Sequence, residues 1–185
     1  VWYFYLFWGA KFLNAQFGIA LKGLALPLII IYVFVYGGGI AGGAVSSYLL
    51  KIGKSTNFAR KITMLGTALL VLPVMIVPFT GSLPIAVGLI ALAAAAHNSW
   101  SANIFTVASD LFPKKVVGSV IGFSTTVSSF AGIGTAYLIG LALEGAGVKG
   151  YVFPFVIAAF GYLIGLMVMQ LISPKMNPVK NIQNR

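Results

Sequence analysis

The stretch Leu83–Leu111, LPIAVGLIALAAAAHNSWSANIFTVASDL, places the polar segment His97–Asn103 in the middle of a long apolar run. At about 1.5 Å per residue in a helix, His97 lies roughly 20 Å from Leu83, near the middle of a bilayer. Polar side chains at that depth are costly, so they usually face protein or a water-filled cavity and often mark a solute pathway. This stretch therefore predicts a membrane helix of a candidate transporter.

The composition extends this prediction to the whole chain of 185 residues. Hydrophobic residues make up 59%, charged residues only 8%, and the mean hydropathy is +1.00, which predicts an integral membrane protein. We expect an all-α polytopic membrane protein with six transmembrane helices. The apolar segments are Val1–Leu13, Leu26–Leu50, Ile62–Phe79, Leu83–Leu111, Val116–Leu143 and Tyr151–Ile172. The first would cover only about 20 Å, short of a roughly 30 Å core, so we interpret it as a truncated helix whose true N-terminus is missing.

The net charge of +10 could suggest nucleic acid, but its distribution favours membrane topology. Basic residues gather in the connector Lys51–Lys61, at Lys114-Lys115 and in the tail, whereas the connector Thr80–Ser82 is uncharged. This alternation follows the positive-inside rule. It predicts a cytoplasmic loop with Lys51, Arg60 and Lys61, a membrane domain over 1–173, a cytoplasmic tail over 174–185, and no nucleic-acid partner.

An enzyme is not expected from this chain. Asp110 and Glu144 are its only carboxylates, it has one histidine, and it has no cysteine. Neither a metal site nor a general acid–base pair can be built from these groups. We therefore expect no metal and no cofactor.

The segment His97–Asn103 offers groups that suit a polyhydroxylated solute. On a helix, His97, Trp100 and Ser101 share a face, Asn103 stands beside Trp100, and Asn98 points elsewhere. Amides donate and accept hydrogen bonds, and an indole offers a flat apolar face to a sugar. The alternative is hydrogen bonding between helices without a ligand. His97 could also take part in proton coupling, or serve as a fixed hydrogen-bond partner.

Further residues could line the same cavity. Thr125, Ser128 and Ser129 recur at helical spacing and could form a polar wall, although close packing of small residues is the simpler interpretation. Tyr3 belongs to an aromatic group that either marks the membrane interface or faces the cavity. Glycines spaced four apart in the second segment predict a helix-packing face, or a surface on which helices slide. They are Gly38, Gly39, Gly42 and Gly43.

Several stretches resemble sugar-acid transporters of the major facilitator superfamily. Phe4–Leu13, FYLFWGAKFL, resembles their seventh helix. Ala94–Thr106, AAAHNSWSANIFT, with Ser109–Lys115 and Val117–Gly122, is similar to the tenth and eleventh helices of hexuronate transporters in the anion:cation symporter family. The resemblance spans nearly the whole chain.

The resemblance implies the C-terminal six-helix half of a twelve-helix protein in the bacterial inner membrane. It implies alternating access with proton-coupled uptake of a sugar acid such as a hexuronate or aldonate. Trp100, Asn103 and Ser128-Ser129 would contribute to substrate binding. The family's loop motif usually has an Asp after its glycines, whereas Gly42–Ser47 ends in serines. The coupling carboxylates and a substrate-binding arginine would belong to the missing N-terminal half. An exporter or facilitator of another organic anion, or a non-transporting subunit, stays open.

Overall fold

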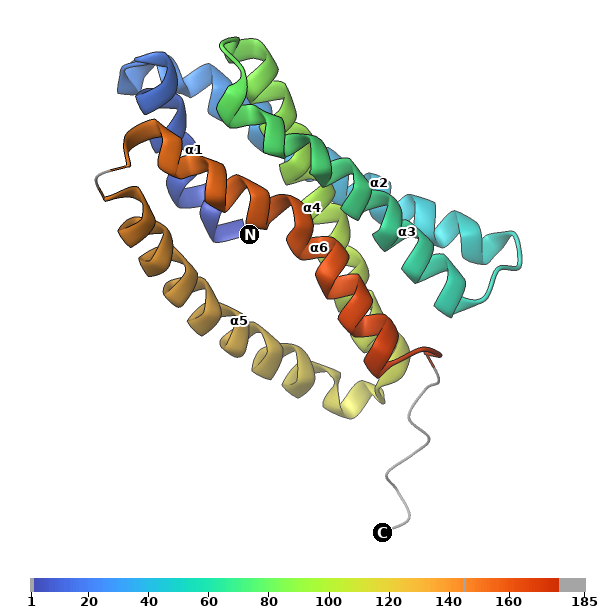
Figure 1. Cartoon of the computed structure of the whole chain (residues 1–185). Coiled ribbons are helices and arrows are strands. Elements are labelled where there is room, and N and C mark those ends of the chain that lie inside the picture. The colour runs from blue at the N-terminus through green and yellow to red at the C-terminus, as the bar shows by residue number, and fades with distance from the viewer. Residues whose placement is uncertain (1, 145, 177–185) are drawn as a thin grey trace.

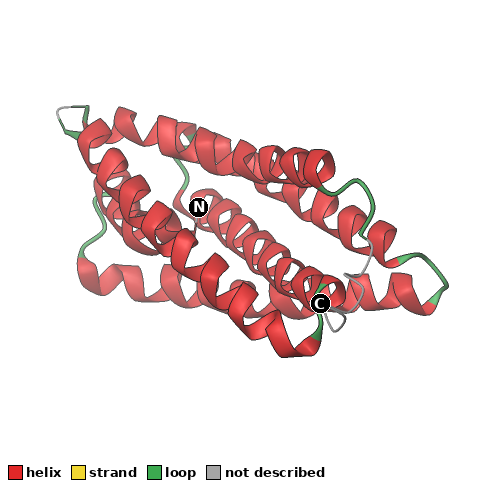
Figure 2. Cartoon of the chain, turned by 90° about the horizontal axis from the view of Figure 1, so that it is seen from below, coloured by secondary structure: helices red, strands yellow, loops and turns green. Residues whose placement is uncertain are grey.

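The computed structural model describes residues 2–144 and 146–176, and this part of the chain is all-helical (Figures 1 and 2). Short connectors join the helices, and short 3-10 segments extend or precede some of them. The elements are α1 (Trp2–Phe17), η1 (Leu21–Leu24), α2 (Ala25–Lys51), α3 (Thr56–Val71), η2 (Leu72–Phe79), α4 (Leu83–Leu111), α5 (Lys114–Leu143), η3 (Gly147–Tyr151) and α6 (Val152–Ile172). The predicted all-α fold is confirmed, whereas positions 177–185 of the predicted tail lie outside the described residues.

Five helical stretches are long and apolar enough to cross a membrane, and they identify an integral membrane protein. They are Lys22–Lys51, Thr56–Phe79, Leu83–Leu111, Lys114–Leu143 and Gly147–Ile172. The remaining helix, α1, has 16 residues and would cover about 24 Å, slightly more than its predicted segment. It ends where Gly18 takes a positive φ of 64°, a conformation that glycine adopts without steric cost.

The predicted cytoplasmic loop is shorter than expected, because α3 begins at Thr56 and not near Ile62. Ser55 caps this helix, and its Oγ accepts a hydrogen bond from the Phe58 backbone N at 3.2 Å. Such a cap satisfies a backbone donor that would otherwise have no partner. Arg60 and Lys61 therefore lie on α3, and of the three residues assigned to this loop only Lys51 adjoins the connector.

Helix α4 is the centre of the bundle. It packs most extensively against α2, and also against α3 and η2. Where α1 and α6 meet, Phe12 of α1 and Phe155 of α6 are fully buried. Their ring centroids lie 5.0 Å apart. By contrast, α5 runs apart from α6 along its middle (Figure 1), and Ile139 is the buried residue that this helix contributes among those described.

Successive spans run in opposite directions (Figure 1), so the ends of α2, α4 and α6 and the beginnings of α3 and α5 lie towards one end of the bundle. We call this the basic end, because most of the chain's described lysine and arginine residues lie there. They are Lys51, Lys54, Arg60, Lys61, Lys114, Lys115 and Lys175. The grouping agrees with the charge pattern that the positive-inside rule describes.

Candidate functional site: a divided polar segment in α4

The polar segment of α4 is divided between two neighbouring surfaces. Asn98, Ser99 and Asn103 face α2, where the two helices pack closely. His97, Trp100 and Ser101 form the other group, which contacts α1 and α6. A helix places residues three and four apart on one side, which is why His97, Trp100 and Ser101 stay together. One side of the segment thus packs against α2, and the other side forms part of an aromatic surface.

On the α2 side, the two amides bond to backbone carbonyls. Asn98 Nδ2 donates to the Val35 O at 2.8 Å. Asn103 is 1% exposed, and its Nδ2 donates to the Ser99 O at 3.0 Å and to the Gly42 O at 3.4 Å. The bonds to Val35 and Gly42 are the interhelical hydrogen bonds that the sequence left open as an alternative, whereas the bond to Ser99 lies within α4. Asn103 Oδ1 and Ser99 Oγ are buried without a hydrogen-bond partner among the described residues.

Glycines of α2 make this contact possible. A methyl group at Gly38 would overlap the backbone of Ala95, and one at Gly42 would overlap Ser99. At Gly39 it would come within 2.6 Å of Asn98 Nδ2, whereas at Gly43 it would meet nothing within 4 Å. Such small residues allow two helix backbones to approach closely. Three of the four glycines chosen from the sequence therefore face α4.

On the other side of α4 lies a group that we call the aromatic cluster: Trp2, His97, Trp100, Ser101 and Tyr162. His97 Nδ1 and the Tyr162 hydroxyl are hydrogen-bonded at 2.7 Å, and Ser101 Oγ lies 3.4 Å from His97 Nε2. The Trp2 ring stacks on His97 with centroids 5.3 Å apart. Trp100 meets the Tyr162 ring edge-on at 5.3 Å. Helix α4 contributes His97, Trp100 and Ser101 and α6 contributes Tyr162, all from the middle of their spans, whereas Trp2 comes from the start of α1.

Two further polar atoms of α1 are buried without a hydrogen-bond partner in the described part of the chain. They are the hydroxyl of Tyr5 and Nε1 of Trp8. A buried donor without a partner costs about 1–3 kcal/mol, so native structures usually supply water, a ligand or another protein group. These two atoms are therefore candidates for contact with a polar solute or its water.

The hydroxyl residues of α5 stand apart from the aromatic cluster. Thr125 Oγ1 donates to the Ile121 O, and Ser129 Oγ donates to the Thr125 O at 2.9 Å, so both satisfy their own helix. Ser128 is exposed. Further along, a methyl group at Gly132 would overlap the Tyr3 ring, which places Tyr3 between α1 and α5. The structure thus joins α5 to α1 through Tyr3.

Sequence reasoning missed Tyr162 and gave Trp2 no specific role. A tyrosine inside an apolar span is indistinguishable from core packing by periodicity alone. One signal was present: Tyr162 lies in the middle of α6, where an unpaired hydroxyl would be expensive in lipid. The Tyr162 hydroxyl therefore needs a hydrogen-bond partner, and His97 provides one at a comparable depth.

A second polar network closes the basic end. Arg60 Nε donates to Asp110 Oδ2 at 2.9 Å, and its Nη1 donates to Ser46 Oγ at 2.6 Å. The network joins α2, α3 and α4. Arg60 is buried, and Ser46 occupies the stretch where the family motif usually has an Asp. A serine hydroxyl accepts the guanidinium hydrogen bond without adding a second negative charge.

The fold and these buried polar groups define a polytopic helical membrane protein with polar residues in the middle of its spans. No protein-family model matches the sequence. The chain is 30% identical to the "Probable galactarate/D-glucarate transporter" of Bacillus subtilis (strain 168) over 145 residues, which is 78% of this chain and 32% of that protein. It is also 30% identical to a protein of the same description in Escherichia coli (strain K12), over 75% of this chain and 31% of that one.

A third relative, from Pseudomonas putida, bears the same description and is 29% identical over 153 residues, or 80% of this chain and 32% of that protein. The resemblance to sugar-acid transporters is confirmed, and the chain spans about a third of the length of the relatives it matches. These relatives are described as transporters and not as enzymes, in agreement with the prediction that the chain is not an enzyme.

Proposed function

We propose that this chain is the C-terminal six-helix half of a secondary transporter that takes up a sugar acid with protons by alternating access. The descriptions of the relatives favour galactarate or D-glucarate, with hexuronates and aldonates as related candidates. The chain matches about a third of the length of each relative. This supports the interpretation of the chain as part of a larger protein, whose fold needs further helices. If the basic connectors face the cytoplasm, as the positive-inside rule describes, the basic end and the C-terminus lie on the cytoplasmic side. The membrane would be a bacterial inner membrane.

The observation that carries the proposal is the aromatic cluster in the middle of α4 and α6. Trp100 is half-buried, so part of its indole is open to a solute. An indole packs against the C–H face of a sugar, and the hydroxyl of half-buried Ser101 can exchange hydrogen bonds with sugar hydroxyls, while Tyr162 is buried and its hydroxyl holds His97. The orphan hydroxyl of Tyr5 adds a donor on the neighbouring helix.

The exposed surface of α5 supports a missing partner half. The most apolar stretch of 18 residues in this helix contains no buried residue. Large apolar side chains of this stretch are exposed. They include Phe123 at 74% and Phe130 at 72% exposure.

The carboxylates of the substrate still need a cation, and the resemblance assigns the arginine that pairs with them to the other half. In this proposal, Thr125, Ser128 and Ser129 face the space between the halves.

Trp100→Ala is expected to lower sugar-acid uptake by roughly tenfold, the equivalent of about 1.4 kcal/mol of lost binding, because the apolar face for the sugar is removed. The measurement is uptake of labelled D-glucarate by the full-length protein in proteoliposomes. Tyr162→Phe is expected to cause a smaller loss, and Tyr48→Phe, an exposed tyrosine of α2, is the control. Normal uptake by Trp100→Ala would remove the aromatic cluster as the binding site.

His97 is expected to position Tyr162 and not to carry the coupled proton, because both ring nitrogens already face hydroxyls. His97→Gln should therefore keep proton-driven accumulation and raise the apparent KM about fivefold, as expected for one lost hydrogen bond of about 1 kcal/mol. Accumulation is measured with an imposed pH gradient, and downhill exchange without one. Loss of accumulation with intact exchange would instead make His97 the coupling residue.

A further inference from the structure

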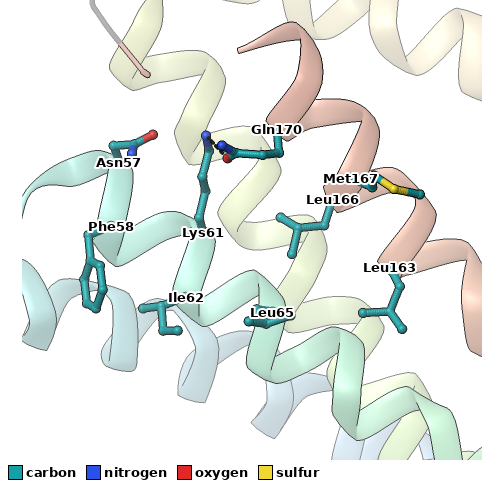
Figure 3. A pocket seen from close by; sticks show the side chains of 9 residues that line it. All are labelled: Asn57, Phe58, Lys61, Ile62, Leu65, Leu163, Leu166, Met167 and Gln170. Carbon is teal, nitrogen blue, oxygen red and sulfur yellow. Dashed lines mark hydrogen bonds between the residues drawn. The ribbon is translucent and has the colours of Figure 1, made fainter. Parts of the chain in front are cut away.

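An apolar groove runs between α3 and α6, away from the aromatic cluster. It has a volume of about 480 Å³, within the range of about 300–1,000 Å³ that is typical of small-molecule sites. Side chains of both helices line it, mostly leucines, isoleucine, phenylalanine and methionine (Figure 3). Its lining residues are Asn57, Phe58, Lys61, Ile62, Leu65, Leu163, Leu166, Met167 and Gln170.

The polar residues of the groove gather at one end of it. Figure 3 shows Asn57, Lys61 and Gln170 at that end, while Leu65 and Leu163 lie farther along. This is the basic end of the bundle, where α3 begins and α6 finishes. The groove is therefore amphipathic along its length, with an apolar trough that leads to an ammonium group.

Among the described residues, the groups that accept hydrogen bonds from the Lys61 ammonium are all neutral. Its Nζ donates to Gln170 Oε1 and the Ser173 O, each at 2.7 Å, and to the Pro174 O at 2.9 Å. The ion pair that the described residues form joins Arg60 to Asp110, so Lys61 has no carboxylate partner among them. Gln170 is exposed, and an anionic oxygen could replace its amide oxygen on the ammonium. A charge-assisted bond of that kind is roughly twice as strong as a neutral one.

Two neighbours add to this anion-binding end. Asn57 Oδ1 accepts a hydrogen bond from the Met176 backbone N at 3.3 Å, which leaves its amide nitrogen as a donor. Lys175 is exposed and follows Pro174, whose carbonyl holds Lys61. A phosphate at the mouth of the groove would thus meet an ammonium, an amide donor and a second cation.

We propose that this groove binds one acyl chain of an anionic phospholipid, with the lipid phosphate at Lys61 and Asn57. Both helices are long and apolar enough to cross a membrane, which would expose the apolar trough to lipid chains, and basic residues at the end of a span attract anionic headgroups. Exposed Phe58 and Met167, at 47% and 59%, offer flexible apolar walls to such a chain. The inference does not depend on which solute the protein carries.

The test is native mass spectrometry of the purified full-length protein titrated with phosphatidylglycerol or phosphatidylcholine of the same acyl chains. The parent protein is expected to bind phosphatidylglycerol in preference. Lys61→Gln should lower that preference about fivefold, as expected for one lysine near an anionic headgroup, while Lys61→Arg keeps it. Lys114→Gln, at the same end but outside the groove, is the matched control and should change little.

A second variant tests the apolar part without changing the charge. Leu166→Trp fills the trough and should weaken binding of both lipids, while Lys61 remains intact. Glycerol phosphate, which has no acyl chain, should bind the parent protein far more weakly than the lipid. Equal preference in the parent and Lys61→Gln proteins, or unchanged lipid binding by a folded Leu166→Trp protein, would overturn the proposal. A dimer that buries this face and excludes lipid would overturn it as well.

Discussion

Gly38→Ala is expected to lower the free energy of unfolding by about 2–3 kcal/mol, although the change adds a single methyl group. The added Cβ would overlap the backbone carbonyl of Ala95, and a backbone cannot rotate aside as a side chain can. The two helices must therefore separate. That movement would also disturb the hydrogen bond from Asn98 to the Val35 O.

Gly37→Ala provides a matched control, because a methyl group there meets nothing within 4 Å. In a helix interior, alanine is favoured over glycine by about 1 kcal/mol. The Gly37→Ala protein should therefore be as stable as the parent protein or slightly more stable. The two substitutions are chemically identical and lie on adjacent residues of α2. Thermal unfolding of the full-length protein in detergent measures both. Equal stability of the two variants would contradict the close contact between α2 and α4.

The sequence predicted the helices well because apolar length is a direct property of a membrane span. The predicted segment Leu83–Leu111 has the same limits as α4, since Pro113 and the lysines after it end the apolar run. The largest difference fell at the start of α3, where Arg60 and Lys61 were interpreted as loop residues. Charge suggests water, but Arg60 is buried because Asp110 and Ser46 hold its guanidinium.

The candidate site was only partly predictable. Helical periodicity gives the angle between Asn98 and Trp100 around α4, but it does not say which neighbouring helix each one meets. The structure turns Asn98 and Asn103 towards α2 and leaves Trp100 beside Tyr162. Pairing of His97 with Tyr162 joins residues 65 positions apart, and such a contact needs the fold and cannot be read from local spacing.

Arg60→Met is expected to destabilise the protein by about 3 kcal/mol, because breaking a buried ion pair leaves the other charge without a partner. The Arg60 side chain is 8% exposed and that of Asp110 is 28% exposed, so water compensates the remaining carboxylate only in part. Ser46 Oγ also loses the hydrogen bond that Arg60 Nη1 donates to it at 2.6 Å. Three helices, α2, α3 and α4, would lose their common polar link at the basic end.

A double-mutant cycle separates this ion pair from simple packing loss. Asp110→Asn alone should also destabilise the protein, since it leaves the buried guanidinium without its counter-charge. Combining Arg60→Met with Asp110→Asn should cost clearly less than the sum of the two, because neither charge is then left unpaired. Lys51→Met, an exposed cation at the end of α2, is the control and should change stability by no more than about 0.5 kcal/mol. Strictly additive losses in unfolding free energy would show that Arg60 and Asp110 act independently.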